Sequence, residues 1–229
     1  MFPKSKMEST VLAFVFTLVF VGLYLARTDL LYFEGVYVRE DSYIEWLTFM
    51  ALFFGGIASF YRIIILKPFR TTSFIIGLLL TGLFFWFGAG EEISWGQRVF
   101  GFKSPEFFMQ YNAQYEFNLH NLKFGNFKVN KIIFGSILSL CVICYFFILP
   151  YLYRKYDKFK ELVNNWAIPL PQYYHIFLYV LLFVTCVFIK KSPSGKSGEI
   201  LEFGGTWICL LMILNPLNRP IFSRKSIDR

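Results

Sequence analysis

The chain has 229 residues, of which 56% are apolar, 21% are aromatic and only 17% are charged. This composition excludes a disordered chain, a collagen-like fibre and a disulfide-stapled secreted scaffold, and it supplies too few polar residues to cover a water-soluble globule. The net charge of +8 therefore indicates a charge bias of membrane loops rather than a nucleic-acid-binding surface. We expect the lipid bilayer to be a partner and nucleic acid not to be one.

Six apolar runs are close to the ~20 residues that a helix needs to cross a bilayer. The first run follows Lys4 and Lys6 and carries Tyr24 where a cleavable signal peptide needs a small residue, so we expect an uncleaved signal anchor. The sixth run must include Glu202 to span. The sequence predicts an all-α integral membrane protein with one domain, residues 1–229, and six spans at about 10–26, 44–66, 71–90, 132–153, 172–189 and 200–217.

Charge predicts the orientation of this bundle. If the N-terminus is cytoplasmic, more than half of the 23 basic residues fall on the cytoplasmic side, as the positive-inside rule requires. The C-terminus is then cytoplasmic as well, and the partly ordered loop 91–130 is extracytoplasmic or re-entrant. Most of the 15 acidic residues fall on the same side as this loop, so one end of the bundle collects carboxylates.

These carboxylates come from three segments, residues 34–45, 91–92 and 199–202. We interpret Asp41 as the N-cap of the second span. Glu91 and Glu92 stand together at the end of the third span, where two acids oppose the helix dipole. Arg98, a bound cation or a proton must therefore offset their charge. An ionisable residue at membrane depth, such as Glu202, predicts a functional site.

Loop 91–130 contains a strict alternation of polar and apolar residues. Period-two alternation is typical of an extended strand with two distinct faces. Such a strand would place Asn112, Gln114, Glu116, Asn118 and His120 along one edge and bury Tyr115, Phe117 and Leu119 on the other. A short helix that begins at Asn118 is the competing interpretation.

Carboxylates, one imidazole and several amides at one end of a bundle are the groups that general acid–base catalysis uses. The same donors would suit a divalent cation, but the chain carries no recognised ligand motif, so the cofactor stays undefined. We assign catalytic roles to Glu91, Glu92, Glu116 and His120. We assign substrate binding to Trp95, Gln97, Arg98, Asn112, Gln114, Asn118, Asn121 and Glu202. The alternative is a hydrogen-bonded plug that packs the loop against the membrane.

Other polar and small residues are interpreted as structural. His175, which follows Tyr173 and Tyr174, is typical of an anchor at the membrane interface. Gly55 and Ser59 form a small-xxx-small pair that favours a close helix contact. The cysteines lie in apolar runs and are predicted to be packing residues rather than disulfide or zinc ligands; they are Cys141, Cys144, Cys186 and Cys209.

Two segments carry a resemblance: Gly90-Glu-Glu-Ile-Ser-Trp-Gly-Gln-Arg98 and Asn112-x-Gln-x-Glu-x-Asn-Leu-His-Asn121. They resemble a family of uncharacterised bacterial multi-pass membrane proteins, and the surrounding spans resemble it only in layout. The resemblance implies a bacterial inner-membrane protein and implies no reaction. A comparison with ceramidase-like membrane hydrolases, which place several His around zinc, is poor because the two His of this chain fall on opposite sides of the predicted bundle.

Three functional hypotheses follow from the sequence. The first is a membrane-embedded enzyme that acts on a lipid or lipid-linked substrate. The second is a cation or proton transporter or channel with an acidic vestibule, although four of the six spans have no charged residue in their middles. The third is a structural or assembly protein whose polar loop docks a membrane-protein partner. The oligomeric state is left open.

Overall fold

The computed structural model describes residues 5–125, 127–194 and 196–224. Within them, six helices are long and apolar enough to cross a membrane. This confirms the prediction of an all-α, multi-pass membrane bundle. The six are α1 (Lys6–Thr28), α3 (Tyr43–Leu66), α4 (Thr72–Glu92), the composite helix Lys131–Lys155, α10 (Tyr173–Lys190) and α11 (Ser197–Leu214).

Two helix ends differ from the predicted spans in a way that matters for function. The third span does not stop at Gly90, because α4 continues to Glu92 and places both Glu91 and Glu92 in its last turn. The sixth span begins at Ser197 rather than Ile200, so Glu199 and Glu202 both lie inside α11. Glu91, Glu92 and Glu199, which the predicted spans leave outside the membrane helices, are therefore part of α4 and α11.

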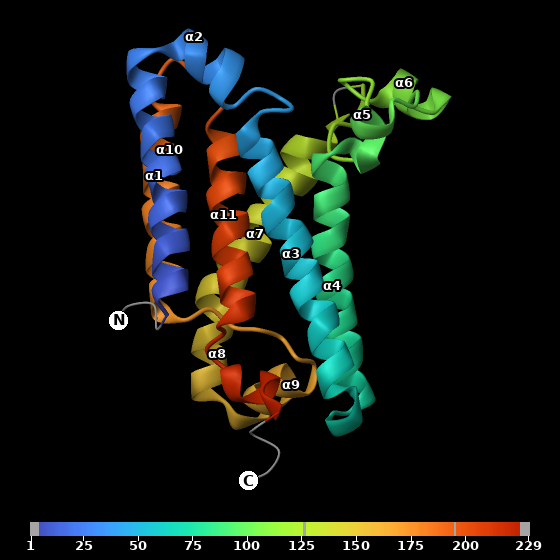
Figure 1. Ribbon diagram of the computed structural model, residues 1–229, viewed down its shortest axis with the longest axis vertical. Helices are drawn as coiled ribbons and strands as arrows, with labels where there is room; N and C mark the ends of the chain where they lie inside the picture. The colour runs from blue at the N-terminus through green and yellow to red at the C-terminus, as the bar shows by residue number, and fades with distance from the viewer. Residues whose placement is uncertain (1–4, 126, 195, 225–229) are drawn as a thin grey trace.

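Successive helices run in opposite directions, and this sets the two ends of the molecule (Figure 1). The end at which α1 begins also carries the short helix η6 (Arg219–Phe222), and we call it the terminal end. Residues 91–125 and 127–130 lie at the opposite end, which we call the loop end. Part of the charge on which the orientation depends, including Lys4 and Arg229, lies outside the described residues.

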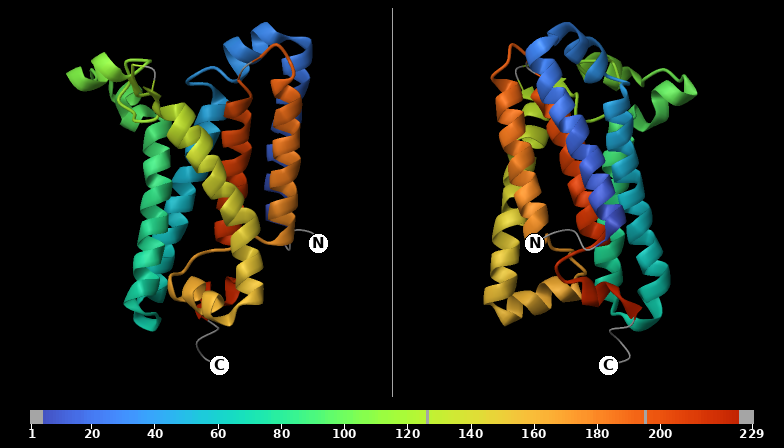
Figure 2. Two further views of the ribbon diagram at one scale, coloured as in Figure 1. Left: turned by 180° about the vertical axis from the view of Figure 1, so that it is seen from behind. Right: turned by 60° about the vertical axis from the view of Figure 1, so that its left-hand side comes forward.

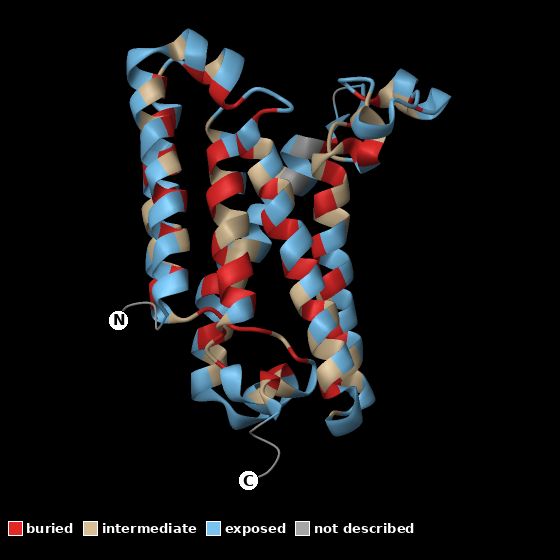
Figure 3. Cartoon of the chain, viewed as in Figure 1, coloured by how far each residue is buried: buried red, intermediate tan, exposed pale blue. Residues whose placement is uncertain are grey.

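Five of the spanning helices form a row that ends in a group of three. α4 contacts α3, α3 contacts α11, and α11, α10 and α1 contact one another. Buried apolar residues line the inner sides of these helices, and the outward sides are largely exposed (Figure 3). The largest buried cluster joins α1, α10 and α11 and includes Val15, Val19, Leu182, Ile200 and Phe203.

The α3–α4 contact is close because small residues lie on it. A Cβ atom added to Gly55 would lie 2.2 Å from the Phe85 ring, and Ser59, one turn further along, is buried. This confirms the close helix contact predicted from Gly55 and Ser59.

The fourth span crosses behind this row of helices (Figure 2). It is built from η4 (Asn130–Ile137), α7 (Leu138–Ile143), η5 (Cys144–Ile148) and α8 (Leu149–Lys155), of which η4 and η5 are π-helical. Few of its side chains are buried, Phe146 and Pro150 among them. Most of this span is therefore free to contact lipid.

Shorter elements cover the two ends of the bundle. At the loop end, α2 (Leu30–Tyr32) and η1 (Phe33–Tyr37) lead from α1 towards α3. At the terminal end, η2 (Lys67–Phe69) ends the second span, and α9 (Asp157–Asn165) lies across the bundle (Figure 1). All four cysteines are free thiols.

Candidate functional site

The chain reverses direction directly after α4 through three left-handed residues. Ser94, Trp95 and Gly96 have φ values of 48°, 54° and 81°. Non-glycine residues adopt this conformation at an energetic cost, and such residues concentrate at functional sites. The reversal forms η3 (Ser94–Gly96) and directs α5 (Gln97–Phe100) and α6 (Glu106–Tyr111) away from the helix row (Figure 1).

Residues 112–121 form neither the predicted strand nor the competing helix. The segment closes as a loop, in which the N–H of Ala113 donates to the carbonyl of Asn121 at 2.9 Å. Tyr115, expected on the buried edge, is 61% exposed and left-handed, and Leu119 is also exposed. Two short strands, β1 (Lys123–Phe124) and β2 (Phe127–Lys128), follow.

The side chain of Asn112 explains why the alternation does not produce a strand. Its Oδ1 accepts from the N–H groups of Gln114 and Glu116 at 2.9 and 3.2 Å, and its Nδ2 donates to the carbonyl of Asn118 at 2.9 Å. Asparagine side chains compete in this way with backbone pairing. The polar residues still converge, but around a turn rather than along one edge.

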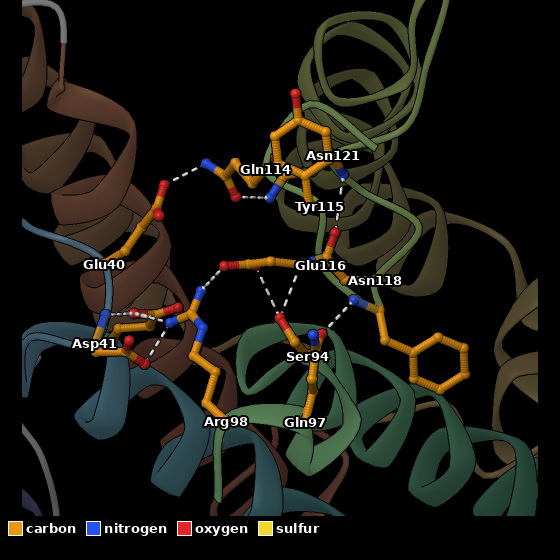
Figure 4. A network of polar contacts seen from close by, with 12 residues as sticks. Glu40, Asp41, Ser94, Gln97, Arg98, Gln114, Tyr115, Glu116, Asn118 and Asn121 are labelled. Carbon is orange, nitrogen blue, oxygen red and sulfur yellow. Dashed lines mark hydrogen bonds and ion pairs between the residues drawn. The ribbon is translucent and has the colours of Figure 1, made fainter. Parts of the chain in front are cut away.

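Glu116 lies at the centre of a polar network that ties this loop to the turn after α4 (Figure 4). Its Oε2 accepts from the hydroxyl of Ser94 at 2.9 Å and from Nδ2 of Asn118 at 2.8 Å, and its Oε1 accepts from Arg98. Nδ2 of Asn118 also donates to the Ser94 hydroxyl at 3.0 Å. Glu116 is therefore engaged by three residues of its own chain.

Arg98 connects the loop to the start of α3. It forms ion pairs with Asp41 and Glu116 and lies 3.8 Å from Glu45. Burial lowers the pKa of Arg98, but its hydrogen bonds to the two carboxylates outweigh burial and raise it above the ordinary value. The interpretation of Asp41 as a helix cap is wrong: α3 begins after Ser42, and Asp41 turns to Arg98.

Other predicted substrate-binding residues also bind the loop. Oε1 of Gln97 accepts the N–H of Phe117 at 2.6 Å. Gln114 donates to Glu40, and Asn121 donates to Gln114 (Figure 4). These amides hold the loop in shape and tie it to the segment before α3.

Glu91 connects the loop to the last turn of α4. Its carboxylate is buried, and its Oε1 accepts from Nε1 of Trp95 at 2.8 Å. Its Oε2 accepts from the N–H groups of Leu119 and His120 at 2.7 and 2.9 Å. Both oxygens are engaged by protein donors, which suits a positioning residue better than a proton carrier.

The ring of His120 is oriented by the same carboxylate. Nδ1 of His120 lies 3.3 Å from Oε2 of Glu91. Burial lowers the pKa of His120, but the contact with Glu91 and the charges of Glu202 and Glu116 raise it above its ordinary value overall. A carboxylate at one ring nitrogen fixes the tautomer and the direction of the ring.

A second group of carboxylates lies beside His120 and belongs to the membrane helices. Glu92 of α4 is in electrostatic contact with Glu202 and Glu199 of α11 and with Glu45 of α3. Among the described residues, no hydrogen-bond donor contacts the side chains of Glu92 or Glu202. These two carboxylates therefore differ from Glu91 and Glu116, whose oxygens are engaged by the protein.

Within the part of the chain that the structure describes, no three His, Cys, Asp or Glu side chains are placed to hold a metal ion. The described residues therefore give no ligand set for the divalent cation considered from the sequence.

A buried polar cluster at the terminal end was missed by sequence reasoning. His175, expected at the interface, is fully buried, and its Nε2 lies 3.6 Å from Oε1 of Glu8. The hydroxyl of Tyr174 donates a hydrogen bond to the same oxygen. Nδ2 of Asn215 contacts Oε2 of Glu8 at 3.3 Å. The sequence feature that could have revealed this cluster is Glu8, an acidic residue in the first turn of an otherwise apolar span.

No family model, curated protein or solved structure matches the chain. The resemblance to the bacterial membrane-protein family therefore stays a prediction, and the case for function depends on the geometry of the loop end.

Proposed function

We propose that this protein is a membrane-embedded enzyme that uses His120 with Glu92 and Glu202 as acid–base groups on a lipid or lipid-linked substrate. The sequence-based assignment of His120 and Glu92 to the reaction is kept. Glu202 moves from substrate binding to proton transfer, because its carboxylate acts electrostatically on His120. Glu91 and Glu116 become positioning residues.

One observation carries the proposal: an imidazole held by a buried carboxylate is within electrostatic range of Glu202, which, like Glu92, receives no hydrogen bond from the described residues. Glu91 fixes the ring of His120, while Glu92 and Glu202 receive no hydrogen bond from the described residues. An oriented histidine beside carboxyl groups in different environments is the usual arrangement for moving a proton.

The saturated network supports this division of roles. Ser94, Arg98 and Asn118 engage Glu116, and the loop backbone engages Glu91. Catalytic groups need a rigid supporting shell to hold their geometry, and this network would supply it. We further propose a bacterial inner membrane with cytoplasmic termini, which places the site on the outer face; the charge distribution supports this orientation.

A reconstituted system tests the proposal. The purified protein is placed in liposomes of bacterial lipid extract, and lipid products are followed by mass spectrometry. We expect the wild type to convert at least one lipid species. His120→Gln and Glu92→Gln should each slow that conversion by about 100-fold or more, because a positioned acid–base group contributes roughly 10²–10⁴-fold.

Glu106→Gln is the matched control, since Glu106 is exposed on α6 and lies outside the network. It should leave the rate unchanged. If His120→Gln and Glu92→Gln fold like the wild type and convert lipid at its rate, the proposed function is wrong.

A second candidate, a proton or cation transporter, is favoured by one observation. α11 carries Glu199 and Glu202 near one end and is followed at the other by Asn215, which contacts the buried Glu8. These polar groups lie about 20 Å apart along the helix, and the residues between Glu202 and Asn215 carry no charge. Proton flux in liposomes that Glu202→Gln abolishes, without any lipid conversion, would favour transport over catalysis.

A further inference from the structure

An apolar groove lies on α3 and α4 beside the proposed site. Its volume is about 580 Å³, within the roughly 300–1,000 Å³ of small-molecule sites. The groove lies towards the loop end of the two spans, and Phe53, Leu83 and Trp86 in its lining are exposed. Most of its lining is aromatic: Phe49, Phe53, Leu83, Trp86, Phe87, Ala89, Gly90, Ile93, Trp95, Gly96 and Phe100.

The walls of the groove are held in place by the protein. The ring of Trp86 stacks on Phe53 with centroids 6.0 Å apart and planes 4° apart, and its Nε1 donates to the carbonyl of Phe53 at 3.4 Å. Gly56 leaves the space that this ring needs, because a Cβ there would lie 2.1 Å from Trp86. The groove is therefore formed before any ligand arrives.

Trp95 forms the rim of the groove nearest the loop, and its ring is held in place by Glu91. Its indole Nε1 donates to Oε1 of Glu91 at 2.8 Å, and its ring packs edge-on to Phe87 at 5.8 Å. The ring covers Gly90, where a Cβ would come within 2.9 Å of it. Glu91 therefore positions both the rim of the groove and the ring of His120.

A small polar pocket adjoins the groove at Ile93. Ile93 lines both the groove and a small pocket whose other walls include Glu45, Glu92 and Arg98. A molecule that lies along the groove and passes Ile93 would meet first a continuous apolar surface and then carboxylates and a guanidinium. This sequence of surfaces fits an amphiphile with a long hydrocarbon chain and a polar head.

We propose that the groove binds the hydrocarbon chain of the substrate and that its polar head stands at the mouth of the pocket beside Ile93, whose volume of about 10 Å³ leaves room for little more than a water molecule. This inference rests on the proposed function and names the substrate class and its pose. The chain would enter sideways from the bilayer between α3 and α4. The head would then stand at Glu92, whose carboxylate has no donor among the described residues.

Photocrosslinking tests the pose without requiring turnover. The purified protein in lipid nanodiscs is exposed to one of two probes with a diazirine in the chain, a fatty-acyl phospholipid or a polyprenyl phosphate. Labelled peptides are then mapped by mass spectrometry. We expect one probe to label the stretches around Phe53 and Trp86 at least fivefold more than the equally lipid-facing stretch around Ile64, which is 75% exposed on α3. The probe that does so identifies the chain class.

Leu83→Trp fills the groove from one wall and should reduce this labelling at least fivefold. Leu80→Trp is the matched control, because Leu80 is an exposed leucine on α4 that does not line the groove; its labelling should equal that of the wild type. Uniform labelling of all lipid-facing stretches by both probes would overturn the inference, as would unchanged labelling in a folded Leu83→Trp protein. The wild-type map decides the matter if Leu83→Trp does not fold.

The two proposals fail in different ways. His120→Gln should abolish conversion and leave labelling of the groove intact. If labelling meets the expected pattern while His120→Gln and Glu92→Gln retain full activity, the groove is supported as a binding site and the acid–base assignment is wrong. If conversion depends on His120 but no probe selects the groove, the catalytic proposal stands and the groove is not the substrate site.

Discussion

Oε2 of Glu91 contacts His120 in two ways, accepting its backbone N–H at 2.9 Å and lying 3.3 Å from its ring Nδ1. One buried carboxylate at the end of a membrane helix thereby fixes both the main chain and the side chain of a loop residue. The same group holds Trp95 through its other oxygen. Glu91 is the point where the loop, the helix and the proposed groove meet.

Replacement of Glu91 by Gln should loosen this junction. The amide of Gln places an NH2 where a carboxylate oxygen now accepts hydrogen bonds, so N–H groups of the loop lose a partner. We expect the free energy of unfolding to fall by about 3 kcal/mol and Trp95 emission to shift to the red as its ring becomes more exposed. Thermal unfolding and fluorescence in detergent measure both effects.

Glu106→Gln removes the same charge from an exposed position on α6 and should change neither quantity. A Glu91→Gln protein as stable as the wild type would show that the loop is held by the Glu116 network alone.

Stability should fall as pH rises because of His120. Its folded-state pKa lies above its ordinary value, since the neighbouring carboxylates outweigh burial. The resulting stabilisation is fully present below the unfolded-state pKa of about 6.5 and is lost as pH rises through the folded-state value. Melting temperatures across this range should decline in the wild type. His120→Gln should flatten that decline, and an equal slope in both proteins would contradict the prediction.

The ion pairs of Arg98 should differ in strength. Glu116 is 14% exposed and Asp41 is 52% exposed, so water screens the pair with Asp41 more strongly. A double-mutant cycle of Arg98→Ala with Glu116→Gln should give a coupling energy of about 1–2 kcal/mol, and the cycle with Asp41→Asn should give less than about 0.5 kcal/mol. Equal couplings would contradict the burial argument.

Two glycines should respond to Ala in opposite directions. A Cβ on Gly77 would lie 1.8 Å from the backbone carbonyl of Trp166, whereas a Cβ on Gly198 meets nothing within 4 Å. Gly77→Ala should destabilise the protein by about 3 kcal/mol, because a backbone atom must move. Gly198→Ala should stabilise α11 by about 0.5–1 kcal/mol. Thermal unfolding of both variants checks the pair.

The terminal-end cluster should contribute to stability. Glu8→Ala removes the acceptor for Tyr174 and Asn215 and the carboxylate that lies 3.6 Å from the buried His175. We expect a loss of about 3 kcal/mol, because buried polar groups are left without their partner. Tyr174→Phe, which removes one donor, should cost about 1 kcal/mol. If Glu8→Ala unfolds at the same temperature as the wild type, the cluster does not contribute to stability.

The spans were predictable because a membrane helix is a local property of composition. About 20 apolar residues cross a bilayer whatever their neighbours do, so α1, α3 and α4 lie close to their predicted ranges. Alternating crossings then place Glu45, Glu92 and Glu202 at one end without any knowledge of packing. Prediction of this clustering needed only the order of charged and uncharged runs.

The path of residues 112–121 could not be predicted from the sequence. Alternation predicts a strand only when a neighbouring strand or an apolar surface accepts both of its faces. Here the side chain of Asn112 bonds the backbone of its own segment, and Glu116 turns inward to Arg98 and Ser94. Local hydrogen bonds outweigh the alternation.

The composition of the chain, 56% apolar and 17% charged, determines the class of protein, and the apolar runs determine the number of its spans. The order of charged and apolar runs determines which end of the bundle carries most of the carboxylates. Only the tertiary structure decides that both oxygens of Glu91 accept hydrogen bonds while its neighbour Glu92 accepts none from the described residues. Only the tertiary structure brings Glu8 beside His175, which lies far away in the sequence. Apolar burial in lipid depends on composition, whereas the partner of a polar group depends on where the folded chain places its donors.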